Sequence, residues 1–179
     1  MPRTGLALVG LLLAGAAAAK VVAGVDLPSS MALGEQPLLL ASCGVRDTLW
    51  VEHYVAALYL RPGQTIAATR DPAQPIVVLL HVIRGASLPQ RIPEQWRTPL
   101  REELELDPLA RVRAAYAQLG SGDRVVVSYE PGAGVAMAVN GRTVATAPGH
   151  ELIDSMLRSW ADGDPRSGKL QRLALEHPC

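Results

Sequence analysis

Aromatic residues and net charge are both scarce in this 179-residue chain. It has three tryptophans, four tyrosines and no phenylalanine, so a platform on which single-stranded bases stack is not expected. The 17 Lys and Arg residues balance 17 Asp and Glu residues, which leaves a formal net charge of zero. This balance argues against a strongly basic nucleic-acid surface and an acidic disordered tail, and we expect no nucleic-acid partner.

Cysteine is nearly absent, with Cys43 and Cys179 as the only two. Two cysteines cannot build a framework of several disulfides or a zinc site of four thiolates. The four histidines are scattered without a pair at ligand spacing, so no metal site is expected. In an oxidising compartment the two cysteines can pair, but the sequence leaves a disulfide and two free thiols both open.

The first 19 residues have the pattern of a secretory signal peptide. Arg3 gives a basic start, and residues 5–19 follow without a charged or polar side chain and end in four alanines. The run is shorter than the roughly 20 residues that a membrane-spanning helix needs, although a retained anchor is the alternative. We predict cleavage after Ala19, a single domain over residues 20–179, a periplasmic or secreted location, and no stable membrane insertion after cleavage.

Hydrophobic residues make up 49% of the chain, which is enough for a packed core. Apolar runs bounded by turn residues predict strands at 21–25, 37–42, 48–60, 76–83, 123–129, 135–139 and 143–146. Asn140-Gly141, between the last two runs, is a strong hairpin pattern of type I′.

Helical patterns lie between and after these runs. A helix bent by Pro93 and Pro99 is expected at 88–105, a second from its N-cap at Asp107 to Gly120, and a third at 149–161. The second helix has one apolar stripe, formed by Leu109, Val112, Tyr116 and Leu119. The order of elements predicts an α+β fold on a mostly antiparallel sheet.

Three blocks of sequence lie in order along the mature chain. The first is Gly44-Val45-Arg46 followed by residues 51–60 (VEHYVAALYL). The second joins Gly122-Asp123, residues 129–134 (YEPGAG) and Val139-Asn140-Gly141, and the third joins Gly149, residues 157–160 (LRSW), Pro165 and Lys169-Leu170. Together these blocks resemble the chalcone isomerase-like family, in its exported bacterial branch.

The resemblance implies an open-faced sandwich, in which a layer of helices packs a large antiparallel sheet and leaves a ligand cleft between them. Plant enzymes of the family close a ring within the substrate by adding a phenolate oxygen to an enone, and they use no cofactor. Other proteins of this fold bind fatty acids without doing chemistry. The fold therefore leaves the function open, and the site has to decide it.

Arg46 is the principal candidate because it resembles the family's guanidinium that faces the cleft. A guanidinium suits a ligand carboxylate and an enolate oxygen alike, while the alternative is a surface arginine in a turn. Trp50 and Tyr54 lie at even spacing from Arg46, so all three share a face if the chain is extended throughout. We predict Arg46, Trp50 and Tyr54 as ligand-binding residues, and Arg46 and Tyr54 as catalytic residues if the protein is an enzyme. For Tyr54, a core tyrosine is the alternative.

The chain departs from the plant enzymes in its helical part. Those enzymes supply a Tyr, a Lys and an Asn around the cleft from outside the Arg-bearing strand. The matched region at 94–103 (EQWRTPLREE) contains none of the three. The helical half of an isomerase site is therefore expected to be missing.

The sequence thus predicts an exported protein that binds a small, apolar, anionic ligand, either fatty-acid-like or aromatic, without a cofactor. The second hypothesis is a cofactor-independent isomerase, an intramolecular lyase that acts on an enone with a different acid/base group. The third is a periplasmic protein that binds a partner and is not catalytic. The sequence leaves the ligand's identity and the oligomeric state open.

Overall fold

The structure is a computed structural model that describes residues 19–48, 50–89, 91–92, 94–161 and 179. The predicted signal peptide up to residue 18, and the part of the third sequence block at Pro165 and Lys169-Leu170, lie outside the described residues. Within the described ranges, no helix has the length and hydropathy needed to cross a bilayer.

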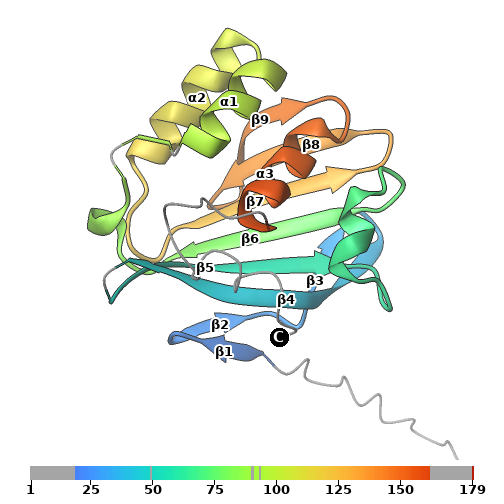
Figure 1. The fold of residues 1–179 in the computed structure, drawn as a ribbon, viewed down its shortest axis with the longest axis horizontal. Helices are drawn as coiled ribbons and strands as arrows, with labels where there is room; N and C mark the ends of the chain where they lie inside the picture. The colour runs from blue at the N-terminus through green and yellow to red at the C-terminus, as the bar shows by residue number, and fades with distance from the viewer. Residues whose placement is uncertain (1–18, 49, 90, 93, 162–178) are drawn as a thin grey trace, which may run out of the picture.

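A seven-stranded antiparallel sheet, in which every strand pairs with the next one along the chain, forms the body of the fold. Its strands are β3 (Ser30–Leu33), β4 (Gln36–Thr48), β5 (Val51–Leu60), β6 (Ile76–Val82), β7 (Arg124–Glu130), β8 (Gly134–Val139) and β9 (Arg142–Ala147). A separate two-stranded hairpin consists of β1 (Lys20–Val22) and β2 (Val25–Leu27). Figure 1 shows this hairpin beside β4, on the side of the sheet away from the helices.

In the described part of the chain, three α-helices cover the other face of the sheet: α1 (Glu94–Glu103), α2 (Leu106–Ala117) and α3 (Glu151–Ala161). Two short 3₁₀ helices, η1 (Ile66–Arg70) and η2 (Gly85–Ser87), flank β6. The predicted α+β fold on an antiparallel sheet is confirmed.

The predicted start of the second helix is wrong by two residues, because the N-cap is Glu105 and not Asp107. Pro108 lies in the first turn of α2, where a backbone N–H would have no helical partner, so the helix can begin before it. The helix also ends at Ala117, before Gly120. The first helix is shorter than predicted, since α1 begins at Glu94 and η2 occupies part of the preceding segment.

The predicted strand at 48–60 is wrong at its start. β4 continues to Thr48 and β5 begins at Val51, so the chain reverses between them. Trp50 has a φ of 70°, in the left-handed region that a tight reversal requires. Apolar residues continue through this turn without a glycine or proline, and the sequence therefore gives no indication of it.

The hairpin predicted at Asn140-Gly141 is confirmed. Both residues have positive φ, 50° and 79°, and Val139 pairs with Arg142 across the turn. The Asn140 side chain also ties this turn to β7, because its Oδ1 accepts a hydrogen bond of 2.9 Å from the Arg124 backbone N–H.

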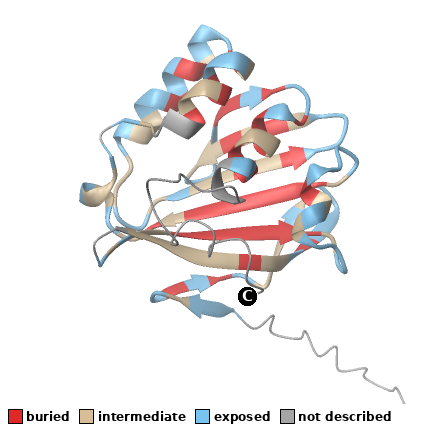
Figure 2. Cartoon of the chain, in the orientation of Figure 1, coloured by how far each residue is buried: buried red, intermediate tan, exposed pale blue. Residues whose placement is uncertain are grey.

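Both faces of the sheet carry buried apolar residues. On β5 the alternation is complete, with Ala56, Leu58 and Leu60 in the cluster that packs the helices and Val55, Ala57 and Tyr59 in the cluster on the opposite face. Val25 and Leu27 of the small hairpin cover that opposite face. Figure 2 shows β5 and β6 as largely buried strands in the middle of this arrangement.

Cys43 on β4 forms a disulfide with Cys179, with their Cα atoms 5.4 Å apart. The sequence left this pairing open, and the structure joins the two residues. Cys43 packs against the cluster that faces the β1–β2 hairpin. The disulfide therefore attaches the last residue to the face of the sheet that is opposite the helices.

Candidate functional site

A cavity of about 600 Å³ lies between the sheet and the helical layer. This volume falls within the range of roughly 300–1,000 Å³ that is usual for sites that bury a small molecule. Most of the lining is apolar and comes from the inner face of the sheet (Leu80, Val82, Val125, Val127, Met137, Val139, Val144) and from the helices and their connections (Leu88, Ile92, Trp96, Leu100, Val112, Ala115, Leu119, Met156). The polar side chains of the lining are few, so each one restricts what can bind.

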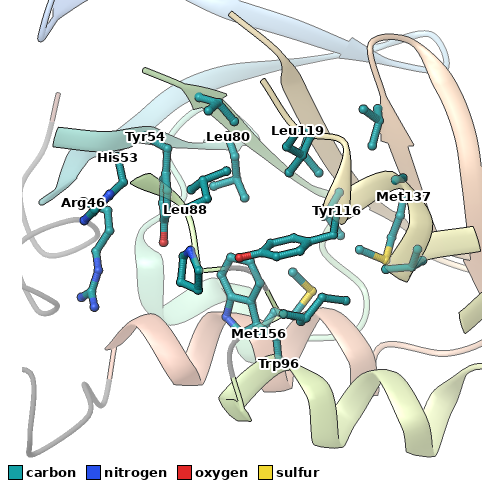
Figure 3. A pocket seen from close by; sticks show the side chains of 18 of the residues that line it. Arg46, His53, Tyr54, Leu80, Leu88, Trp96, Tyr116, Leu119, Met137 and Met156 are labelled. Carbon is teal, nitrogen blue, oxygen red and sulfur yellow. The ribbon is translucent and has the colours of Figure 1, made fainter. Parts of the chain in front are cut away.

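Arg46 and Tyr54 both line this cavity, as the sequence predicted. They are register partners on β4 and β5, and side chains of paired residues lie on the same face of a sheet. Figure 3 shows both at one end of the cavity, with Leu88, Tyr116 and Met137 beyond them. A guanidinium with only donors therefore stands next to a phenol at the edge of an apolar space.

Trp50 does not join them. It is 96% exposed, it lies in the turn between β4 and β5, and it is not among the residues that line the cavity. The prediction that Trp50 shares a face with Arg46 and Tyr54 is wrong, because it required the chain to be extended throughout.

His53 also lines the cavity, and no pattern in the sequence predicts this. Arg46 pairs with Tyr54 and Asp47 pairs with Glu52, so His53 is the extra residue of a β-bulge. Its backbone oxygen accepts hydrogen bonds from the N–H groups of residues 83 and 84, at 2.9 and 3.2 Å. These bonds hold the segment that leads into η2 against the end of β5.

The His53 ring is fixed by Ser87 of η2, whose Oγ lies 2.8 Å from His53 Nδ1. Burial and then the nearby Arg46 guanidinium lower the pKa of His53 from its ordinary value, while Asp47 acts in the opposite direction. The imidazole is therefore neutral near pH 7.

Tyr116 brings a phenol into the cavity from α2. The expectation that the helical side supplies none of the isomerase residue types is wrong in this respect. It was based on residues 94–103, whereas the tyrosine belongs to the apolar stripe of the next helix. Burial raises the pKa of Tyr116, so the phenol keeps its proton. Among the described residues, neither a Lys nor an Asn lines the cavity.

No group of three or more His, Cys, Asp or Glu side chains that could hold a metal ion occurs within the described ranges.

Comparison with models of known protein families shows which family the chain belongs to. The model of a family described as chalcone isomerase-like matches residues 19–175. The chain belongs to the chalcone isomerase-like family. No curated protein matches this chalcone isomerase-like chain.

Among solved structures, a fatty-acid binding protein of Arabidopsis thaliana has a similar fold, with a TM-score of 0.55 and 13% sequence identity. The likeness covers 87% of this chain and 96% of the plant protein. At this identity the likeness shows the fold alone. It confirms that the chalcone isomerase-like chain has the predicted open-faced sandwich, in which helices pack one face of a large antiparallel sheet.

Proposed function

We propose that this chalcone isomerase-like protein binds a small ligand with an apolar body and an anionic head, fatty-acid-like or aromatic, in the cavity between sheet and helices. The observation that carries the proposal is the position of Arg46 at one end of an apolar cavity of about 600 Å³. Such a cavity suits a ligand that is mostly hydrocarbon, because each buried CH₂ group contributes about 0.8 kcal/mol.

Arg46 is suited to hold the head group. Among the described residues, none forms an ion pair with it, so its charge is available to a ligand. An apolar surrounding screens that charge less than water does. A carboxylate that accepts two hydrogen bonds from the guanidinium would neutralise it in a geometry that arginine favours.

The fold of the Arabidopsis fatty-acid binding protein supports the same choice of ligand class, since a sandwich of this shape accommodates a fatty acid there. Because the two chains share only 13% of their residues, the argument for this protein rests on its own cavity and on Arg46.

The proposal includes export to the periplasm or to the outside of the cell, as a member of the family's exported bacterial branch. It rests on the basic, apolar and small-residue pattern of residues 1–19. The disulfide between Cys43 and Cys179 supports it, because disulfides persist in oxidising compartments.

A cofactor-independent isomerase is the second candidate, and Tyr116 is the observation that favours it. With Tyr116 on the helical side and Arg46 on the sheet side, an enone would meet a proton donor and a cation for its carbonyl oxygen in one cavity.

The first experiment is native mass spectrometry of the mature protein purified from its export compartment. We expect a reproducible small-molecule adduct on wild type, and a polypeptide mass that starts at Lys20. Arg46→Ala should lose the adduct. Arg142→Ala is the matched control, because Arg142 is an exposed residue of β9 that does not line the cavity.

Titration of the delipidated protein with dodecanoate by calorimetry completes the test. Arg46→Met keeps the apolar stem of the side chain and should weaken binding while circular dichroism shows a folded chain. Folded wild type that carries no adduct and binds no dodecanoate would overturn the binding proposal, and turnover of a hydroxy-enone by the same protein would favour the isomerase. A mass that includes residues 1–19 would overturn export alone.

A further inference from the structure

Ser87 fixes which nitrogen of His53 carries the proton. Its Oγ lies 2.8 Å from the backbone oxygen of Arg84 and 2.8 Å from His53 Nδ1. A carbonyl oxygen can only accept, so the single hydroxyl proton of Ser87 points to Arg84. Ser87 Oγ must then accept the hydrogen bond from His53 Nδ1–H.

The second ring nitrogen, Nε2, consequently carries a lone pair in the neutral imidazole. Neither burial nor Arg46 favours a second proton on the ring, since both lower the pKa of His53. The His53 ring makes no other hydrogen bond among the described residues. Near neutral pH, Nε2 is therefore an acceptor on a residue that lines the cavity at the same end as Arg46 (Figure 3).

A ligand at this end meets hydrogen-bond donors from Arg46 and an acceptor from His53, and a plain carboxylate can satisfy only the donors. Its oxygens accept hydrogen bonds from Arg46, but it has no proton to give to Nε2 of His53. A hydroxyl close to the carboxylate provides the missing donor. Sites that hydrogen-bond a ligand hydroxyl discriminate against the analogue that lacks it, because a buried polar group is then left unpaired.

We propose that the site selects hydroxylated acids, in which the carboxylate binds Arg46 and a neighbouring hydroxyl donates to Nε2 of His53. The inference rests on the proposed function, since it names the ligand class for the same cavity. His53 would act as a specificity-determining residue and Ser87 as the residue that positions it.

The test compares three probes on the delipidated mature protein at pH 7.5: dodecanoate, 2-hydroxydodecanoate and 3-hydroxydodecanoate. Calorimetry should give at least one hydroxy acid an affinity about tenfold higher than that of dodecanoate. His53→Phe should remove the preference and still bind dodecanoate. His81→Phe is the control and should keep the preference, because His81 lies on β6 and does not line the cavity.

Equal affinity of wild type for all three acids would overturn this inference and leave the proposed function standing. Failure of all three acids to bind would overturn the proposed function itself. A measurement independent of any substitution is a ¹H–¹⁵N NMR spectrum of the histidine rings. It should place the proton of His53 on Nδ1, and a proton on Nε2 alone would also overturn the inference.

Discussion

Arg46 on β4 is the direct register partner of Tyr54 on β5. The hairpin that joins the two strands therefore places a guanidinium and a phenol side by side at one end of an apolar cavity. Arg46, His53 and Tyr54 lie at this end, and the lining beyond them is mostly apolar apart from the Tyr116 phenol. The head and the body of a ligand can thus be tested separately.

Ala115→Trp should block the part of the cavity that would hold the ligand's apolar body. Ala115 lies on α2 and lines the cavity, so an indole at this position occupies space that a ligand needs. We expect calorimetry with dodecanoate to show a loss of binding of at least about tenfold, which corresponds to about 1.4 kcal/mol.

Ala114→Trp is the matched control, since Ala114 is the preceding residue of the same helix and is exposed. It should bind dodecanoate as wild type does. If Ala115→Trp binds dodecanoate equally well while remaining folded, the ligand does not occupy this cavity.

Trp50 was predicted from the sequence to bind the ligand, but in the structure it lies outside the cavity. Substitutions at Trp50 can test which of the two is correct. Trp50→Gly and Trp50→Ala should both leave dodecanoate affinity unchanged, because the side chain is 96% exposed and does not line the cavity. Weakened binding in both variants would restore Trp50 as a ligand contact.

The same two variants should differ in stability. At a φ of 70° the Cβ atom of alanine costs about 1 kcal/mol, a cost that glycine does not have. Urea denaturation should therefore show Trp50→Gly to be more stable than Trp50→Ala by about this amount. Equal stabilities would mean that the turn relaxes out of the left-handed region.

The sequence was sufficient to predict that Arg46 and Tyr54 share one face, but the reasoning behind this prediction was wrong. Even spacing puts two residues on one face of an extended strand. Next to this turn, however, paired residues lie at odd spacing, and only the bulge at His53 brings Arg46 opposite Tyr54, eight residues further on. The prediction that these two residues share a face is therefore correct because of the bulge, and not because the chain is extended. Trp50 lies in the turn and does not share that face.

His53 could not be predicted in this way. It lies at odd spacing from Arg46, which would turn it to the opposite face of a regular strand. The bulge between β4 and β5 leaves His53 without a partner on β4, and a bulge re-aims the side chain that it carries. A bulge has no distinct residue pattern, so the register is visible only in the structure.

Tyr116 illustrates a second limit of prediction from the sequence. Its place on an apolar stripe with Leu109, Val112 and Leu119 was clear from the sequence. A stripe indicates that one face of a helix is covered, but it does not distinguish a solid core from a cavity wall. In the structure Leu109 belongs to the buried core, whereas Tyr116 and Leu119 line the cavity.

Gly85→Ala should destabilise the segment that positions Ser87. A Cβ atom on Gly85 would lie 2.7 Å from the Cα atom of Gly120 and 2.8 Å from the backbone oxygen of Leu119. Since both neighbours are backbone, the contact cannot be relieved by a side-chain rotation. We expect urea denaturation to show a loss of about 1–3 kcal/mol.

Gly120→Ala is the matched control on the other side of this contact. Its Cβ atom would have a side-chain oxygen of Asp123 as its nearest neighbour, at an ordinary distance of 3.7 Å. The free energy of unfolding should change by no more than about 0.5 kcal/mol. Equal effects of the two substitutions would contradict the close approach of η2 to the turn before β7.

Tyr59 and Tyr129 allow the Tyr→Phe substitution to be compared at a hydroxyl without a hydrogen-bond partner and at a hydroxyl with one. The Tyr59 hydroxyl is fully buried on the face opposite the helices and has no hydrogen-bond partner in the described part of the chain. The Tyr129 hydroxyl donates a hydrogen bond of 2.6 Å to the backbone oxygen of Pro72. By urea denaturation at pH 7, Tyr59→Phe should be more stable than wild type by about 1 kcal/mol and Tyr129→Phe less stable by about 1 kcal/mol. If both substitutions changed the free energy of unfolding in the same direction, this difference in hydrogen bonding would be contradicted.

Tyr59 should also make the fold sensitive to alkali. Burial raises its pKa from the ordinary value of 10.0 to about 12, although the Arg124 charge acts in the opposite direction. Below pH 10 both the folded and the unfolded chain keep the phenol proton, and the full contribution of Tyr59 to stability is present. Above pH 10 the unfolded chain loses this proton first, so the free energy of unfolding should fall until the pH passes the folded value near 12. Tyr59→Phe has no such proton, and its stability should decline less steeply than that of wild type over this interval. Parallel declines in the two proteins would show that Tyr59 ionises equally easily in the folded and the unfolded chain.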